Sequence, residues 1–293
     1  MLTIFSTTKP FIENTGIIQT NALRSWAALK PACEIILFDS DEGTARIIAE
    51  LGIRQVTQIE RNEYGTPLVS SMFKIAQNMA NNKFLCYVNA DIILMSEFVQ
   101  ALSQIDKQFF LMVGRRWDMD ISEILNFQNT DWEEELKNRV VKEGRLHRIT
   151  GVDYFVFPKG LYEDMPPLAI GRPGWDNWLI YHSRFRKIPV IDASSMVTAI
   201  HQNHGYASFS GGDKGFWEGP EAKRNAELIG GVEHAFHLGF TDWTLTVKGL
   251  RPARSWQSTY FKIRALPVLH PRLHFLMPLV RFPGKIVGAI RSR

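Results

Sequence analysis

Short apolar runs alternate along the chain with longer stretches in which apolar residues recur at helical spacing. Short runs rich in β-branched and aromatic residues predict buried strands, and the longer stretches predict amphipathic helices. The expected strands cover 2–6, 34–38, 53–59, 84–88, 109–113, 153–157, 190–191, 196–200 and 243–247. The expected helices cover 15–29, 41–51, 68–80, 96–105, 131–143, 175–185 and 221–229. This alternation is typical of an α/β fold with a mostly parallel sheet flanked by helices.

The apolar run 84–88 ends abruptly in two polar residues, Asn89 and Asp91. The carboxyl ends of parallel strands line the crevice where open α/β sheets bind their ligands. A carboxylate is costly to desolvate there, and a divalent cation is one of its best partners. Our central hypothesis is that Asp91 holds a metal ion that bridges the diphosphate of a sugar nucleotide. The alternative is that Asp91 caps the helix that begins near Ser96, or accepts hydrogen bonds from loop amides.

Polar residues also follow the first two expected strands. Thr7, Thr8 and Lys9 come after the first strand, and Asp39 comes after the second. In a parallel sheet these ends lie on one edge, so we expect them to form a single pocket with Asn89. Asp39 suits hydrogen bonds from a base or a ribose, or the capping of its own loop. No G-x-G-x-x-G follows the first strand and no P-loop motif occurs, so a bound diphosphate would need a cation instead.

Two histidines, His201 and His204, follow a strand that is expected late in the chain. Neutral imidazole is a good ligand for divalent metals, so one of them can complete the coordination of a metal at Asp91. A single histidine is more often structural. The zinc-protease pattern H-E-x-x-H is absent, so the sequence gives little support to zinc-dependent hydrolysis.

Asp176 begins an expected helix between two tryptophans, Trp175 and Trp178. It suits N-terminal capping, or the role of a base or anchor for a substrate hydroxyl. The indoles can stack on sugar faces, although tryptophans more often belong to the core. Arg172 can pair with a phosphate, and Asp153 can line the acceptor side.

The chain of 293 residues has a net charge of +4, but this charge is unevenly placed. Segment 251–293 holds nine Lys and Arg residues and no Asp or Glu, so the rest of the chain has a net charge of −5. We therefore expect no broad nucleic-acid-binding face. The segment interleaves cations with aromatic and aliphatic residues, which suits an anionic membrane surface near a lipid-linked acceptor. The alternatives are a subdomain that packs on the core, or a dimer contact.

Cys33 and Cys86 are the only cysteines, and neither a disulfide framework nor a C-x-x-C motif is visible. The N-terminus lacks the basic region and apolar run of a signal peptide, and no apolar stretch is long enough to span a bilayer. We therefore expect a protein of the reducing cytoplasm, peripheral on the inner face of the membrane if segment 251–293 binds lipid.

Four strings carry a resemblance to a known family. Asn89-Ala90-Asp91 resembles a D-x-D signature in which Asn replaces the first Asp. The strings GVDYFVF at 151–157, GRPGWDNW at 171–178 and HQNHGY at 201–206 resemble those of a bacterial and plant subgroup of nucleotide-diphospho-sugar transferases. Over residues 1–250 the order of features resembles a glycosyltransferase of the GT-A fold.

This resemblance implies a Rossmann-like sheet of GT-A type over 1–250, with a nucleotide-binding half at 1–113 and an acceptor half at 114–250. Residues 251–293 would be a basic extension. The resemblance also implies transfer of a hexosyl or pentosyl group from a nucleoside-diphosphate sugar, with a UDP-sugar favoured. The acceptor would be a hydroxyl of a glycan or of a lipid-linked glycan, and the cofactor would be Mn²⁺ or Mg²⁺.

Carried over to this sequence, the resemblance assigns the metal to Asp91 and to His204 or His201. It assigns contact with the base to Asp39 and the role of acceptor base to Asp176. We expect the donor to contact Thr7, Thr8, Lys9, Asp39, Asn89 and Asp91, and the acceptor to contact Asp153, Arg172, Trp175 and Trp178. Because Asn89 removes one carboxylate, weaker metal binding is expected. The glycine-rich segment 208–219, which carries Lys214, suits a lid over the donor.

Two other functions stay open. A nucleotidyltransferase that makes the sugar nucleotide would use a similar sheet and the same sheet edge. It typically needs a glycine-rich basic loop after the first strand, and Thr7-Thr8-Lys9-Pro10 does not provide one. A non-catalytic nucleotide- or glycan-binding protein would bind the donor without turning it over.

Overall fold

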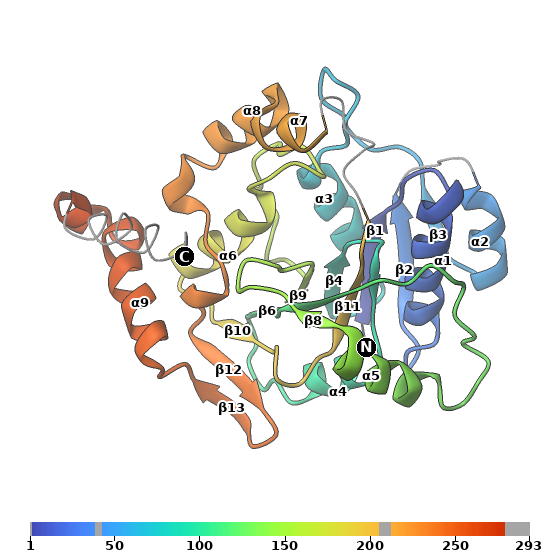
Figure 1. Ribbon diagram of the computed structural model, residues 1–293. Coiled ribbons are helices and arrows are strands. Elements are labelled where there is room, and N and C mark those ends of the chain that lie inside the picture. The colour runs from blue at the N-terminus through green and yellow to red at the C-terminus, as the bar shows by residue number, and fades with distance from the viewer. Residues whose placement is uncertain (1, 39–42, 205–211, 279–293) are drawn as a thin grey trace.

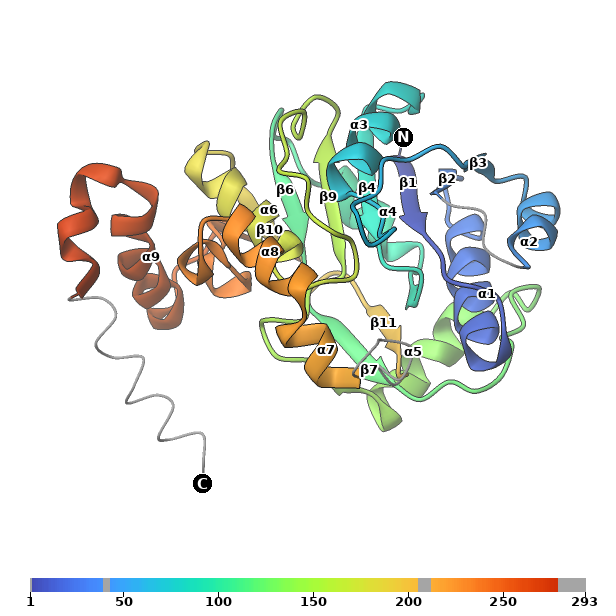
Figure 2. The same cartoon turned by 90° about the horizontal axis from the view of Figure 1, so that it is seen from above.

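A nine-stranded sheet forms the centre of the computed structural model, which describes residues 2–38, 43–204 and 212–278. Helices lie on both faces of this sheet (Figures 1 and 2). Its strands, in spatial order, are β13 (Gly249–Pro252), β12 (Trp243–Thr246), β10 (Val190–Asp192), β6 (Leu111–Val113), β9 (Tyr154–Pro158), β4 (Phe84–Val88), β1 (Leu2–Thr7), β2 (Glu34–Phe38) and β3 (Arg54–Val56).

A smaller sheet of four strands holds β5 (Ile92–Ile93), β11 (Ala199–Gln202), β7 (Arg116–Met119) and β8 (Arg145–Leu146), in this order. The helices of the described residues are α1 (Glu13–Ala27), α2 (Thr44–Leu51), α3 (Val69–Met79), α4 (Glu97–Ser103), α5 (Trp132–Glu143), α6 (Trp175–Phe185), α7 (Gly212–Glu218), α8 (Pro220–Leu228) and α9 (Trp256–Leu269). Short 3-10 helices are η1 (Val232–His234), η2 (Leu238–Phe240) and η3 (Pro271–Leu276). None of the helices in the described ranges is both long enough and apolar enough to cross a bilayer.

The expected α/β class with a mostly parallel sheet is confirmed. Strands β3, β2, β1 and β4 run parallel to one another, as do β6, β10 and β12. Strand β9 is antiparallel to both of its neighbours, β4 and β6, and β13 is antiparallel to β12. The antiparallel β9 matters for the site, because it brings its amino end to the edge where β1 and β4 have their carboxyl ends.

Alternating side chains of the central strands pack into two separate cores. Phe5 and Tyr87 point to the face that α3 and α6 cover, whereas Ile4 and Val88 point to the face that α1 and α4 cover. Phe73 of α3 is fully buried on the first face. Its ring meets Phe5 edge-on at 5.0 Å and stacks on Phe157 at 5.4 Å. The period-two pattern of each strand therefore feeds two apolar layers, one on each side of the sheet.

The small sheet was not expected from the sequence. Strands β5, β7 and β8 have no counterpart among the predicted strands, and β11 begins three residues later than the strand expected at 196–200. A turn in which Met196 N–H donates to Ala193 O at 2.9 Å delays the strand. His201 therefore lies inside β11 rather than after it.

We expect Phe73→Ala to lower the free energy of unfolding by about 3–5 kcal/mol, because the surrounding rings cannot collapse into the cavity. Denaturant unfolding measures this loss. Val141→Ala on α5, where the side chain is exposed, is the control and should change stability by less than about 0.5 kcal/mol. A loss below about 1 kcal/mol for Phe73→Ala would contradict this packing.

Candidate functional site

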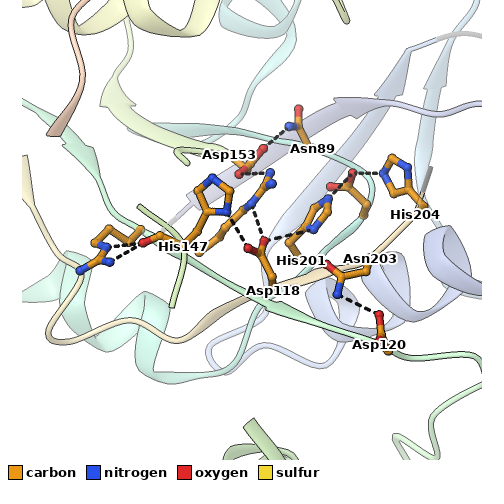
Figure 3. A network of polar contacts seen from close by, with 11 residues as sticks. Asn89, Asp118, Asp120, His147, Asp153, His201, Asn203 and His204 are labelled. Atoms are coloured by element: carbon orange, nitrogen blue, oxygen red, sulfur yellow. Dashed lines mark hydrogen bonds and ion pairs between the residues drawn. The ribbon is translucent and has the colours of Figure 1, made fainter. Parts of the chain in front are cut away.

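The carboxyl ends of β1 and β4 meet at one edge of the central sheet, because these strands are parallel neighbours. Asp153 joins this edge from the start of β9, since Tyr154 pairs with Val88. Asn89 Nδ2 donates to Asp153 Oδ1 at 2.6 Å, and the Asn89 backbone N–H donates to Asp153 O at 3.0 Å (Figure 3). An Asp at position 89 would set two carboxylates against each other, so the Asn of the N-A-D string suits its neighbour.

Asp91 is held through its backbone. Its C=O accepts hydrogen bonds from the backbone N–H of Gln202 at 3.1 Å and from Gln202 Nε2 at 3.2 Å. Gln202 is fully buried in β11, and its amide also donates to Ile18 O at 2.8 Å and accepts from Asn21 Nδ2 at 3.0 Å. Helix α1 therefore fixes β11 and the segment after β4 to each other.

Two imidazoles, those of His201 and His204, face the Asp91 carboxylate (Figure 3). His204 Nε2 lies 2.9 Å from Asp91 Oδ2, and His201 Nε2 lies 3.5 Å from the same oxygen. One potential ligand atom of each residue lies within 4.8 Å of the other two. Asp91 Oδ1 is buried and has no hydrogen-bond partner among the described residues. One carboxylate and two imidazoles are a donor set that transition metals accept, and a cation would satisfy the orphaned oxygen. The residues therefore fit a divalent metal ion.

The carboxylates and imidazoles of this cluster stabilise one another's charged forms. Burial alone would raise the pKa of Asp91, but His201 and His204 outweigh it and hold this pKa well below its ordinary value. Burial alone would lower the pKa of His201, but Asp91 and Asp118 outweigh it and raise the pKa to about 10. The cluster thus favours positive charge beside Asp91. A bound metal ion would take over this role and displace the proton.

A second carboxylate, Asp118, stands on the other side of His201. Asp118 and His201 are register partners on β7 and β11, and His201 Nδ1 lies 3.5 Å from Asp118 Oδ1. His147 Nδ1 lies 2.6 Å from Asp118 Oδ2, and Arg116 Nε donates to Asp118 Oδ1 at 2.9 Å. These contacts hold Asp118 next to His201 Nδ1, which is buried and makes no hydrogen bond among the described residues; a small shortening of the 3.5 Å separation would let Asp118 accept the Nδ1 proton and leave Nε2 for a metal. Carboxylates fix the ring and the tautomer of metal-binding histidines in this way.

Arg116 connects this cluster to the sheet edge, because its Nη1 donates to Asp153 Oδ2 at 3.0 Å. The sequence predictions missed Arg116, Asp118 and His147. Their only signal was that Arg116 and Asp118 lie two residues apart, which would put both side chains on one face of a strand. The string R-W-D-M is too short and too polar to predict such a strand.

The end of β1 supplies a polar group to the same edge. Thr8 is buried, and its Oγ1 has no hydrogen-bond partner among the described residues. Lys9 donates from its backbone N–H to Gln19 Oε1 at 2.6 Å and accepts from Gln19 Nε2 at 2.8 Å, which fixes the loop after Thr7. Asp39, expected to contact the base, lies outside the described residues.

Asp176 lies in the first turn of α6. Its Oδ1 is buried without a hydrogen-bond partner in the described part of the chain. Burial, together with the charge of Asp153, raises the pKa of Asp176 to about 6.

The hydroxyl of Tyr87 donates to Asn89 Oδ1 at 3.1 Å. Burial and the charges of Asp91, Asp153 and Asp176 raise the pKa of Tyr87, so this hydroxyl stays protonated among the three carboxylates.

The other residues expected on the acceptor side serve the fold. Trp175 and Trp178 are only 5% and 6% exposed. Trp175 packs edge-on against Tyr87 at 4.9 Å, and Trp178 stacks on His182 at 4.4 Å. The expectation that both indoles offer faces to a sugar is not supported, because core residues cover them. Arg172 donates from Nε to Glu221 of α8 at 2.9 Å, so it holds α8 in place.

The lid expected at 208–219 is described only in part. Helix α7 covers its second half, and the side chain of Lys214 lies outside the description. In segment 251–293, the inner side of α9 packs on the core through Ala265 and Phe261. That part of the segment fits the alternative of a subdomain that packs on the core.

No protein-family model matches the sequence, and no curated protein matches it. Among solved structures, the chain is similar to Staphylococcus aureus TarS 1–349 in complex with UDP-GlcNAc, with 15% identity and a TM-score of 0.47, over 71% of this chain and 61% of that one. It is also similar to the mannosyltransferase PcManGT from Pyrobaculum calidifontis in complex with GDP-Man and Mn²⁺, with 12% identity and a TM-score of 0.43, over 68% and 56%.

A third similar structure is glucosyl-3-phosphoglycerate synthase from Mycobacterium tuberculosis in complex with Mn²⁺, UDP and glucosyl-3-phosphoglycerate, with 13% identity and a TM-score of 0.42, over 70% of this chain and 72% of that one. The chain spans 61% of this TarS chain and 36% of another, and it spans 86% of a third, TarS 1–349 in complex with UDP.

We expect Asp118→Asn to weaken Mn²⁺ binding by about 10–100-fold, because an amide supports the His201 tautomer less strongly than a carboxylate does. A divalent ion carries more charge than the proton it displaces from His201. Loss of the Asp118 carboxylate therefore destabilises the metal-bound site more than it destabilises the protonated, metal-free site. Calorimetric titration with Mn²⁺ measures the affinity. Asp120→Asn is the matched control, because Asp120 lies two residues along and accepts from Asn203 Nδ2 instead. Equal affinities in the two variants would remove Asp118 from the site.

Proposed function

We propose that this chain is a metal-dependent glycosyltransferase that moves a sugar from a nucleoside-diphosphate sugar to a hydroxyl group of an acceptor. The proposal is carried by Asp91, whose Oδ2 faces two imidazoles and whose Oδ1 is buried with no hydrogen-bond partner among the residues that the structure describes. Asp91 follows β4, at the sheet edge where open α/β folds bind nucleotides. Because the sequence has no glycine-rich phosphate loop, a diphosphate bound at this edge would need a cation.

Asp91, His201 and His204 would hold the ion. Imidazole is a poor ligand for Mg²⁺, which prefers oxygen, so this donor set favours Mn²⁺. When bound, the ion would stabilise the charge that develops on the leaving nucleoside diphosphate. The hydroxyl of Thr8, which has no hydrogen-bond partner in the described part of the chain, would hydrogen-bond the donor from the end of β1. The family resemblance favours a uridine nucleotide, and the acceptor would belong to glycan or polysaccharide biosynthesis.

Asp176 would act on the acceptor. If the reaction inverts the anomeric centre, Asp176 takes the proton of the attacking hydroxyl; if it retains the configuration, Asp176 orients the substrate. Its raised pKa of about 6 suits the first role, because the carboxylate is ionised at neutral pH and is still a stronger base than an ordinary Asp. The hydroxyl of Tyr87, which donates to Asn89 Oδ1, stays neutral near Asp91, Asp153 and Asp176, because burial and their charges raise its pKa.

We expect a nucleoside diphosphate together with Mn²⁺ to raise the thermal midpoint by several degrees, because both bind only the native state. Thermal shift across a panel of nucleoside diphosphates, with and without Mn²⁺, measures the effect and identifies the base. Asp91→Asn should abolish the metal-dependent part of the shift, whereas Asp120→Asn should keep it.

A metal-dependent shift without turnover or hydrolysis of any sugar nucleotide would favour the alternative of a non-catalytic binding protein. The absence of any shift, at concentrations that saturate ordinary donor sites, would contradict the proposed function.

We expect Asp176→Asn to lower kcat by about 10²–10⁴-fold if Asp176 is the base. The same change should stabilise the fold at pH 8 by about 1–3 kcal/mol. The raised pKa contributes stability that is complete below the ordinary value and is lost as the pH rises through about 6, where the buried group must ionise. Asparagine never ionises, so the gain should appear at pH 8 and vanish at pH 4. Wild-type kcat/KM should rise with pH through about 6.

Asp106→Asn, at an exposed position, is the control for both measurements. Full activity in a stabilised Asp176→Asn variant would show that Asp176 is a structural group and that another residue takes the proton.

A further inference from the structure

One side of α9 carries apolar side chains that the core does not cover. Trp256 is 82% exposed, Ile263 and Leu266 are also exposed, and the half-buried Tyr260 lies between them. Steps of four and three residues place Trp256, Tyr260 and Ile263 on one stripe of the helix. The opposite side of α9 is buried at Ala265. The helix therefore has apolar side chains on two sides, an inner side that packs on the core and an outer side that is exposed.

Helix η3 contacts α9 and carries a further exposed apolar side chain, because Phe275 is 73% exposed. We call the stripe of α9 together with Phe275 the α9 face. In Figures 1 and 2, α9 lies at the outer margin of the molecule, beyond α6 and well away from β7 and β11.

The charge carried by the segment that holds the α9 face has one sign, although Glu233 of η1 lines a pocket with Arg264. The described residues 251–278 contain five Lys or Arg and no Asp or Glu, although the chain before residue 251 has a net charge of −5. Arg254 and Arg272 are exposed. Lys262 is bound to Ala253 O at 2.6 Å, and the guanidinium of Arg264 lies 5.7 Å from the centre of the Tyr260 ring.

We propose that the α9 face docks on the surface of an anionic membrane, with α9 lying in the plane of the interface. Exposed tryptophan beside aliphatic side chains suits the boundary between head groups and acyl chains, and the cations suit anionic lipids. A nucleic acid would pair with the cations but would leave Ile263 and Leu266 in water. The contact that we propose is peripheral, through the α9 face, and none of the described helices is long and apolar enough to cross a bilayer.

Docking of the α9 face on a membrane does not require the proposed transfer reaction. What rests on the proposed function is its use, because a transferase on a membrane would meet an acceptor that carries a lipid.

Flotation of the full chain with vesicles tests the proposal. The protein should bind vesicles rich in phosphatidylglycerol and not vesicles of phosphatidylcholine alone, and binding should fall as salt increases. Trp256→Ala should weaken binding by about tenfold through lost apolar burial. The double variant Arg254→Gln with Arg272→Gln should weaken it by at least about tenfold.

Val141→Ala is the matched control, because Val141 is 78% exposed on α5, which carries three acidic residues in its first turn. Binding should be unchanged in this variant. Circular dichroism confirms that each variant is folded.

Three results would overturn the proposal: no flotation with either vesicle, equal flotation with both vesicles, or a dimer in solution that Trp256→Ala dissociates without any vesicle binding. The last would assign the α9 face to a second copy of the chain. The flotation assay contains no nucleotide and no Mn²⁺. A failure to bind vesicles would therefore contradict the docking proposal without affecting the proposed transfer function.

Discussion

The structure depends on a half-buried carboxylate, that of Asp91, which needs positive charge beside it. Asp91 follows the apolar strand β4, and its Oδ1 is buried, so an isolated charge there would destabilise the fold. Two imidazoles stand within 3.5 Å of one of its oxygens, and the other oxygen is left without a hydrogen bond among the described residues. Positive charge beside Asp91 is thus required by the fold, whether protons or a metal ion supply it.

The small sheet places two of the groups that surround Asp91. β11 carries His201 towards Asp91 and lets Gln202 bind the Asp91 backbone, while β7 supplies Asp118 behind the imidazole. Helix α1 supports β11 from its buried polar side, since Asn21 Nδ2 donates a hydrogen bond to Gln202 Oε1. Loss of Asn21 or Gln202 would leave the other side chain buried with fewer hydrogen bonds, which is costly. This cost explains why polar residues stand at these core positions.

The sequence predicted the strands and helices that have a strong apolar pattern. β4 was placed at its observed bounds and α6 at its observed start, because each has a dense apolar pattern and an abrupt polar boundary. The pairing of His201 with Asp118 could not be predicted, since short polar strands have no period and their register comes from tertiary contacts. Nor does sequence tell a buried indole from a sugar-stacking one, so the burial of Trp175 and Trp178 was visible only in the structure.

The most direct test of the metal centre is a crystal structure of the protein with Mn²⁺ and UDP, with anomalous data collected at the manganese edge. The account predicts one anomalous peak within bonding distance of Asp91, His201 and His204, which is about 2.0–2.2 Å, with the diphosphate on its open side. A peak at other residues, or a diphosphate bound at this edge with no metal beside Asp91, would contradict it.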